Sequence, residues 1–375
     1  MVFLFLGCVA FGGPAAHVTL MRRLLVQQRH WLDEEQFFEL FAACQLIPGP
    51  SSTELAVLLG YRRAGWRGLL AAAVSFITPA MGLMLLFAAL YQRFGAGPVG
   101  QRVLAGVTPV VVGIVGWAVV DLGRRVLRSW DVTVVFAGVA ALAVFVNQPI
   151  ALLAGGGGAI ALVRWAGRRA VREPSSGAPV QPAALIAAAG LPTGAASGVA
   201  QISAISLAAV FATFLKLGAV AFGSGYVLLV FLRSELVLNL HWLSDRQVVD
   251  AIALSQATPG PVFTTATFIG FLVAGVAGAV LATVGIFLPG LALVPLLDRI
   301  TRVVRDHLML RDALSGVNVA ALGLIVAVAV ALARVSFAGA EPPIAAAITL
   351  LVMLRWPLSA PALVVAGAIA GGLVA

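Results

Sequence analysis

Charged residues are scarce in this chain of 375 residues. Only 10% of the residues are charged and 61% are hydrophobic, whereas a soluble domain carries about 25% charged residues. So few charges cannot cover a surface that faces water, so most of the chain must face lipid. The backbone is satisfied in lipid only by helices or closed barrels. The apolar runs are long and do not alternate every second residue, and they therefore predict an all-α polytopic membrane protein.

Lysine and cysteine are almost absent. Lys216 is the one lysine, and it lies within an apolar segment. The formal net charge of +9 comes from arginines in short clusters between apolar runs, which is typical of membrane topology rather than of nucleic-acid binding. Cys8 and Cys44 are far apart in apolar runs, and we interpret both as small core residues rather than a disulfide or a metal pair. No metal-ligand spacing, HExxH or serine nucleophile motif occurs, so we expect neither an enzyme nor a cofactor.

The chain contains an internal repeat. With an offset of 211, residues 3–50 align with residues 214–261 without a gap, with 20 identities in 48 positions. After one deletion the offset becomes 210, and further glycines and a proline coincide. Internal repeats are common in transporters. We therefore predict a first transporter repeat over 1–163, a linker over 164–204 that is basic and then rich in Pro, Ser and Gly, and a second repeat over 205–375.

Each repeat is expected to follow the same order. A first helix broken by glycine (about 2–21 and 205–232) leads to a His-Trp-Leu segment, where Asp33 and Ser244 are suited to cap the next helix. An apolar stretch cut by Pro-Gly-Pro follows, over about 36–60 and 247–271. Three further apolar runs complete each repeat.

The loop after the first Pro-Gly-Pro contains three arginines, Arg62, Arg63 and Arg67, whereas its counterpart over 271–277 contains none. The basic side of a membrane protein is the cytoplasmic side. The asymmetry predicts two inverted repeats, each with five crossings plus a re-entrant Pro-Gly-Pro hairpin, or about 10 membrane crossings in all. The alternative is that arginine content simply varies between the copies.

The two Pro-Gly-Pro motifs predict helix breaks at membrane depth. Such breaks survive only when they are buried in protein or line a cavity. Small hydroxyl residues follow each motif and are suited to open a new half-helix, whose free N–H groups and partial positive charge favour an anion. The alternative is a pair of kinks packed against neighbouring helices. The predicted anion-binding residues are Pro48, Gly49, Pro50, Ser51, Ser52, Thr53, Pro259, Gly260, Pro261, Thr264 and Thr265.

Three further features belong to the predicted site. Gly12, Gly13 and Gly223 mark a second pair of breaks, although helix packing alone would explain these glycines. Lys216 is costly within a membrane run, so it is expected either to attract the anion or pair with an acid, or to extend its amine toward water. Glu54 is either a proton-coupling carboxylate or a partner for Arg62, Arg63 or Lys216.

At these residues the sequence resembles the chromate ion transporter family, in its long-chain two-domain form. The resemblance implies a bacterial inner-membrane protein that exports chromate and gives chromate resistance, with sulfate as the alternative oxyanion. Its partners would be the anion and the lipid bilayer, and a homodimer is one alternative for the assembly. Two departures are that the chain begins within its first helix and that Phe5 stands where the family often has a basic residue. The matching motifs are Phe11-Gly12-Gly13-Pro14, Ile47-Pro48-Gly49-Pro50, Ser52-Thr53-Glu54, Gly60-Tyr61-Arg62, Leu215-Lys216-Leu217, Gln256-Ala257-Thr258-Pro259-Gly260-Pro261 and Thr264-Thr265-Ala266-Thr267.

These observations together suggest a mechanism. A tetrahedral dianion would bind between the two broken hairpins, and one repeat would move against the other to give alternating access. An inside-negative potential contributes about 2.3 kcal/mol per charge per 100 mV, so it would drive a dianion outward without a coupling ion.

Overall fold

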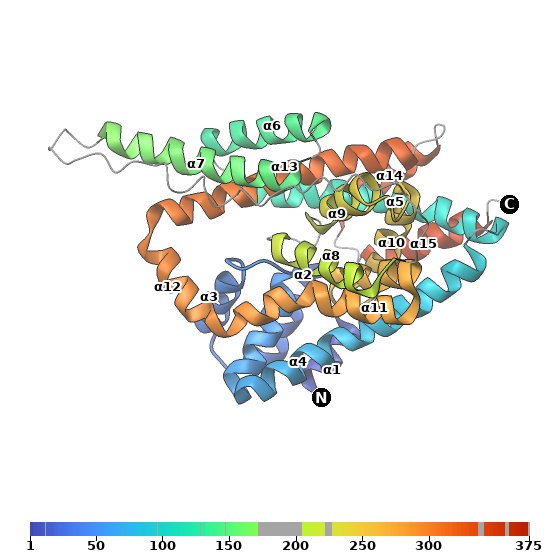
Figure 1. The fold of residues 1–375 in the computed structure, drawn as a ribbon, viewed down its shortest axis with the longest axis horizontal. Helices are drawn as coiled ribbons and strands as arrows, with labels where there is room; N and C mark the ends of the chain where they lie inside the picture. The colour runs from blue at the N-terminus through green and yellow to red at the C-terminus, as the bar shows by residue number, and fades with distance from the viewer. Residues whose placement is uncertain are drawn as a thin grey trace.

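The computed structural model describes residues 1–11, 13–95, 97–127, 129–146, 148–171, 205–221, 227–336, 341–356 and 360–373. This part of the chain is almost entirely helical (Figure 1). Five of its helices are long and apolar enough to cross a membrane by length and composition, and four shorter helices are apolar. The prediction of an all-α, multi-pass membrane protein is therefore confirmed. The number of crossings stays a prediction.

The helices of the first repeat are α1 (Val2–Val9), α2 (Gly13–Met21), the π-helix η1 (Arg22–Gln28), α3 (Glu34–Cys44), α4 (Ser51–Phe94), α5 (Pro98–Val126), α6 (Trp130–Phe145) and α7 (Pro149–Val171). Those of the second repeat are α8 (Leu207–Val220), α9 (Val227–Leu232), the π-helix η4 (Arg233–Asn239), α10 (Asp245–Ala257), the 3-10 turns η5 (Val262–Thr264) and η6 (Val294–Leu296), α11 (Thr265–Leu293), α12 (Leu297–Asp306), α13 (Leu308–Ser336), α14 (Glu341–Arg355) and α15 (Ala360–Leu373).

Backbone irregularities recur at the offset of the sequence repeat. The two π-helices η1 and η4 lie 211 residues apart. His30 and His241, also 211 apart, are the two non-glycine residues with positive φ, at 50° and 54°, in the described part of the chain. A left-handed histidine is uncommon, and two at equivalent positions indicate that both copies keep the same sharp turn before the next helix.

The turn after each π-helix is held by the same contacts in both repeats. Asp33 accepts a hydrogen bond from the Gln36 N–H at 2.8 Å, and Ser244 forms a capping box with Gln247, as predicted from the sequence. Matching ion pairs join each π-helix to the helix that follows its turn, Arg22 with Glu34 at 2.7 Å and Arg233 with Asp245 at 2.6 Å. The hydrogen bond from Arg22 holds the pKa of Glu34 below its usual value.

Helix α4 is a hairpin rather than one straight rod. Ala64 and Gly65 leave helical geometry, and a Cβ placed on Gly60 would lie 2.6 Å from the Cβ of Ala72. Twelve residues of straight helix would separate these positions by about 18 Å, so the chain folds back on itself at Ala64–Gly65. The loop predicted between these two apolar runs is present as a tight turn between two helical arms. Its exposed residues include Arg62, Arg63 and Arg67.

Helix α11 repeats this hairpin. Ala274 and Gly275 leave helical geometry, and the hydroxyls of Thr267 and Thr283, one on each arm, lie 2.7 Å apart. The tip of this hairpin carries no arginine. The arginine asymmetry seen in the sequence thus falls on two structurally equivalent tips.

The last helices of each repeat pack on the other repeat. Helices α6 and α7 of the first repeat lie against α13 of the second, and α14 and α15 of the second lie against α5 of the first (Figure 1). Glycines allow the backbones to approach closely: a Cβ on Gly106 of α5 would lie 2.7 Å from the Cα of Gly371 of α15, and one on Gly316 of α13 would lie 2.8 Å from the Cα of Gly157 of α7. Small residues at helix contacts are the usual basis of such packing in membranes.

A separate group of helices surrounds the two Pro-Gly-Pro motifs. Helix α1 packs on α4, α8 packs on α11, and α4 contacts α11. The first helix of each repeat is broken as predicted: α1 ends at Val9 before α2, and α8 ends at Val220 before α9. These broken helices place their ends beside the Pro-Gly-Pro breaks.

Candidate functional site

Each Pro-Gly-Pro motif interrupts the helical backbone as predicted. Gly49 has φ +124° and Gly260 has φ +90°, a conformation that costs residues with a side chain several times more than it costs glycine. Pro50 and Pro261 are extended and directly precede the next helical turn. The first break opens α4 at once, whereas the second passes through the 3-10 turn η5 before α11 begins.

The breaks are joined to the broken first helices by reciprocal hydrogen bonds. The N–H of Gly49 donates to the carbonyl of Ala221 at 2.8 Å, and the N–H of Gly260 donates to the carbonyl of Ala10 at 2.9 Å. Ala10 and Ala221 are the residues that end α1 and α8. Each glycine therefore satisfies a carbonyl left open at a helix end, and it does so in the other repeat.

His17 connects the two breaks to each other. Its Nε2 lies 3.0 Å from the Ala10 carbonyl, which only accepts, so Nε2 carries the hydrogen. Its Nδ1 lies 3.1 Å from the hydroxyl oxygen of Ser52. Because Gly260 donates to the same Ala10 carbonyl, a continuous path of hydrogen bonds runs from the second break to the first through buried His17. The two breaks are thus neighbours in space.

The hydroxyl groups predicted to bind an anion are all buried, but they are not equally available. Thr264 donates to the Pro261 carbonyl at 2.7 Å, and Thr265 donates to the Val262 carbonyl at 2.6 Å. Their hydrogens point into the 3-10 turn, and an anion needs donors. In this conformation the second break therefore offers an anion less hydroxyl donation than its sequence suggested.

Two polar side chains at the start of α4 have buried atoms without a partner. Within the described residues, neither the Thr53 hydroxyl nor either oxygen of Glu54 forms a hydrogen bond, and both side chains are almost fully buried. Buried polar groups without partners are rare in folded proteins and cluster where a function explains them. The first turn of α4 therefore presents three buried oxygen atoms that lack a hydrogen-bond partner among the described residues.

The partners expected for Glu54 lie elsewhere. Arg62 and Arg63 are exposed at the tip of the α4 hairpin. The amine of Lys216 lies 2.8 Å from Glu235, and its side chain is 50% exposed. Lys216 thus has a partner in η4 and extends away from the buried breaks. Gly13 begins α2, while Gly12 and Gly223 lie outside the described residues.

Sequence reasoning did not select two residues of this region. His17 falls where the two copies differ, since its counterpart is Leu228. Gln256 precedes the second Pro-Gly-Pro by three residues, is buried, and has an amide nitrogen without a partner in the described part of the chain. The signal for Gln256 was present, because Gln45 and Gln256 coincide in the repeat. Gln45 is exposed, so only the second copy brings a free amide donor inside.

A pocket of about 370 Å³ lies between α4, α5, α10 and α11. Asp250, from α10, is buried there and accepts a hydrogen bond from the Tyr91 hydroxyl at 2.8 Å. Arg246, at the exposed start of α10, and Gln92 also line it. Tyr91 belongs to the first repeat and Asp250 to the second, so this polar pocket also lies at the contact between repeats.

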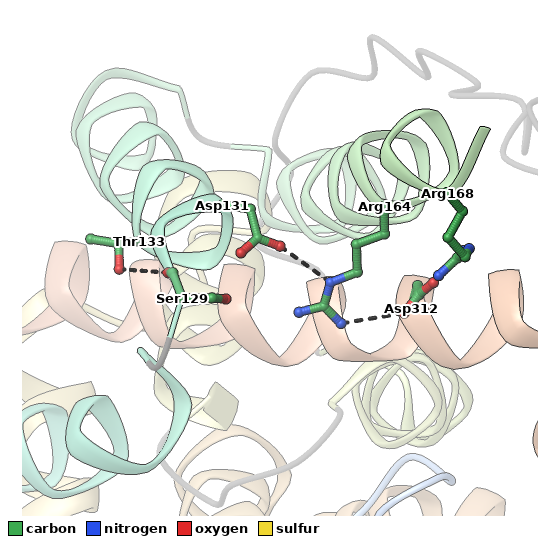
Figure 2. Close-up of polar contacts among 6 residues, drawn as sticks. All are labelled: Ser129, Asp131, Thr133, Arg164, Arg168 and Asp312. Atoms are coloured by element: carbon green, nitrogen blue, oxygen red, sulfur yellow. Dashed lines mark hydrogen bonds and ion pairs between the residues drawn. The ribbon is translucent and has the colours of Figure 1, made fainter. Parts of the chain in front are cut away.

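Ion pairs join helices α6 and α7 of the first repeat to helix α13 of the second. Figure 2 shows Arg164 of α7 between Asp131 of α6 and Asp312 of α13, at 3.2 and 3.3 Å. Arg168 contacts the other oxygen of Asp312 at 2.7 Å. Two arginines and two aspartates cancel in charge, so this cluster stabilises the α6–α7–α13 contact and is not an anion site.

Comparison with known proteins places the chain in a family. The sequence profile described as "Chromate transporter" matches residues 1–163 and 208–373. The chain belongs to the chromate transporter family. The two matched segments are close to the two repeats recognised in the sequence. No solved structure matches the fold.

Three relatives that match most of the chain have names that refer to chromate transport. The chain is 32% identical to the "Chromate transport protein" of Cupriavidus metallidurans, over 100% of this chain and 92% of the relative. It is 33% identical to the "Chromate transport protein" of Pseudomonas aeruginosa, over 89% of this chain and 80% of the relative. A "Probable chromate transport protein" of Synechococcus elongatus is 31% identical over 89% and 84%.

Proposed function

We propose that this protein exports chromate from the bacterial cytoplasm across the inner membrane and thereby gives chromate resistance. The observation that carries the proposal is the hydrogen-bonded path from Gly260 through Ala10 and His17 to Ser52. It brings two helix-opening breaks together inside a membrane protein of the chromate transporter family. The names of the relatives supply the anion, which the geometry alone does not.

The oxyanion binds at the junction of the two breaks. The first turn of α4 places the partial positive charge of a helix start at the break, and the N–H groups of Thr53 and Glu54 within this turn donate to the Pro50 carbonyl. Thr53 and Gln256 each add a buried donor that has no partner among the described residues. A tetrahedral dianion accepts hydrogen bonds on all of its oxygens, and a site of neutral donors holds it without a fixed positive charge.

The two repeats are inverted in the membrane. The tip of the α4 hairpin carries Arg62, Arg63 and Arg67 and faces the cytoplasm, and the arginine-free tip of α11 faces the opposite side. In a background without Cys8 and Cys44, Trp66→Cys and Val276→Cys test this directly, because both positions are exposed at the tips. A membrane-impermeant thiol reagent should label one from each side. Labelling of both from the same side would contradict the inversion.

Alternating access moves groups of helices rather than whole repeats. The helices around the breaks form one group, and α5, α6, α7, α13, α14 and α15 form the other, since these six pack on one another across the repeats. Each repeat contributes to both groups. The sequence suggested that one repeat moves against the other. We propose instead that the two groups of helices move against each other.

Purified protein in liposomes tests the function. Chromate should leave loaded vesicles faster when the outside is made positive, because the potential contributes about 2.3 kcal/mol per charge per 100 mV. Thr53→Val and Gln256→Leu should each weaken chromate binding about tenfold, which corresponds to one hydrogen bond of about 1.4 kcal/mol. Equal competition by sulfate would make the protein a general oxyanion carrier. No protein-dependent chromate flux at any potential would refute the proposal.

A further inference from the structure

Glu54 is a deeply buried acid for which no ion pair is found among the residues that the structure describes. Its side chain is 2% exposed, and none of the described residues hydrogen-bonds either carboxyl oxygen. On α2, His17 contacts Ser52 instead. On α3, the buried side chain of Cys44 carries no positive charge. On α8, Lys216 is occupied by Glu235. An ionised carboxylate left unpaired at this depth is strongly unfavourable, so Glu54 must be compensated either by a proton or by the positive end of α4.

The carboxyl of Glu54 lies in the break itself. Its Oε1 is so close to Gly49 that a Cβ at Gly49 would collide with it. On the opposite side, a Cβ at Gly290 of α11 would lie 2.7 Å from the same oxygen. The side chain therefore occupies space between Gly49 and Gly290, both of which lack a side chain.

The second repeat has no acid at the equivalent place. The positions that correspond to Glu54 are Thr264 at an offset of 210 and Thr265 at 211, and the hydroxyls of both bond to nearby backbone carbonyls. The counterpart of Gly290 is Ala80, and a Cβ on Gly260 would lie 2.9 Å from the Cβ of Ala80. The first break thus combines the large side chain of Glu54 with Gly290, whereas the second break combines smaller threonines with Ala80. The pair of breaks therefore holds one carboxyl group and accommodates it by specific packing.

The charge state of this carboxyl decides what the break can bind. An ionised Glu54 repels a dianion and itself uses the positive end of α4. A protonated Glu54 has no charge and supplies one additional O–H donor to an oxyanion oxygen. The ionised acid and the oxyanion thus compete for the break, whereas the protonated acid and the oxyanion are compatible.

We propose that Glu54 is a proton-binding site and that one proton is carried with each oxyanion. This inference rests on the proposed function and specifies its coupling. When the oxyanion enters, the carboxylate takes one proton from water on that side and forms an O–H bond. When the oxyanion leaves on the other side, this O–H bond breaks and the proton is released there. A dianion then moves one net negative charge per cycle instead of two.

The test measures coupling in liposomes with the voltage held at zero, at alkaline pH where chromate is a dianion. A tenfold proton gradient should then sustain up to a tenfold chromate gradient, with chromate accumulating on the side toward which protons flow. Glu54→Gln, which imitates the neutral acid, should still bind chromate but should accumulate none. Glu39→Gln is the matched control, because it makes the same change at an exposed acid of α3 and should behave as wild type.

Binding provides a second readout. Chromate affinity of the wild type should fall about tenfold for each pH unit above the titration of Glu54, whereas that of Glu54→Gln should not change with pH. Glu54→Asp keeps a carboxyl and should keep the coupling, and the pH dependence and proton-driven accumulation of the wild type test the inference if Glu54→Gln does not fold. Accumulation by Glu54→Gln equal to wild type would overturn the inference. Voltage-driven chromate flux in a wild type that ignores the proton gradient would also overturn it while leaving the proposed function intact. Absence of any chromate flux would refute both.

Discussion

The N–H of Gly49 donates to the carbonyl of Ala221 at 2.8 Å, and this bond joins the break of one repeat to the end of a helix in the other. The bond from Gly260 to Ala10 is its counterpart. Because the two bonds are reciprocal, neither break can change shape without disturbing the first helix of the opposite repeat. The breaks are therefore joints between the repeats as well as candidate binding sites.

Gly260→Ala should destabilise the protein. The substitution forces a side chain into a backbone conformation with φ +90° and places its Cβ 2.9 Å from that of Ala80. We expect a loss of about 1–3 kcal/mol in the free energy of unfolding, measured as a lower melting temperature in detergent. Gly82→Ala is the control, because its helical position is exposed with open space around it. An unchanged melting temperature in Gly260→Ala would contradict the claim that this break joins the two repeats through a strained glycine.

His17→Leu makes the first copy identical to the second at this position, where the counterpart is Leu228. It should cost about 1–3 kcal/mol of stability, because buried Ser52 and Ala10 each lose a partner. Chromate transport should fall with it, since the path between the breaks is cut. His307→Gln, at an exposed histidine, should change neither quantity. Full transport by His17→Leu would mean that the two breaks act independently.

Gly290→Ala should reveal the contact with Glu54. The added Cβ would lie 2.7 Å from Oε1, and such overpacking costs about 1–3 kcal/mol. Combining it with Glu54→Thr recreates the residue types of the second break, where threonines follow Pro-Gly-Pro and Ala80 lies opposite Gly260. The double variant should regain most of the lost stability, so a double-mutant cycle in melting temperature should show strong coupling. Additive effects would place the Glu54 carboxyl away from Gly290.

Asp312→Asn should weaken the contact of α7 with α13. Asp312 is 4% exposed and is approached by both Arg164 and Arg168, so the change leaves two cations with less compensation. We expect a loss of about 1.5–3 kcal/mol, the range for hydrogen bonds to charged groups. Asp131→Asn should cost less, because Arg164 still has Asp312. Equal losses in the two variants would show that the cluster does not depend on Asp312.

Tyr91→Phe removes the hydrogen bond to Asp250 while keeping the ring contact with Phe268, whose centroid lies 5.3 Å away. A buried carboxyl that loses its donor should lower stability by about 1–3 kcal/mol. In an Asp250→Asn background the same change should have a much smaller effect. Equal effects in both backgrounds would assign the contribution of Tyr91 to packing alone.

Much of the architecture could be predicted from the sequence because it depends on local rules. Proline and glycine fix where the helices break, so the interruptions at 48–50 and 259–261 and the broken first helices follow directly. The caps at Asp33 and Ser244 follow from residue type and position. The repeat could be recognised because the copies retain these same residues at a constant offset.

The remaining features depend on contacts between distant segments. His17 lies where the copies differ, so comparison of the repeats passes over the residue that joins the breaks. The hydroxyls of Thr264 and Thr265 turn inward because the backbone takes a 3-10 turn there, which residue type does not specify. Lys216 pairs with Glu235, 19 residues away, across a helix break. The reversal in α4 is confined to Ala64 and Gly65 with helix on both sides of it, so it is shorter than the predicted loop.

The packing of α6 and α7 on α13, and of α14 and α15 on α5, has a consequence for the covalent connection between the repeats. Each half keeps its own terminal helices on the surface of the other half, so the two are interlocked. Co-expressed polypeptides divided within residues 172–204 should associate into one particle, whereas either polypeptide alone would present an uncovered α5 or α13. The peptide link between the halves would then serve to fix their one-to-one ratio rather than to keep them attached.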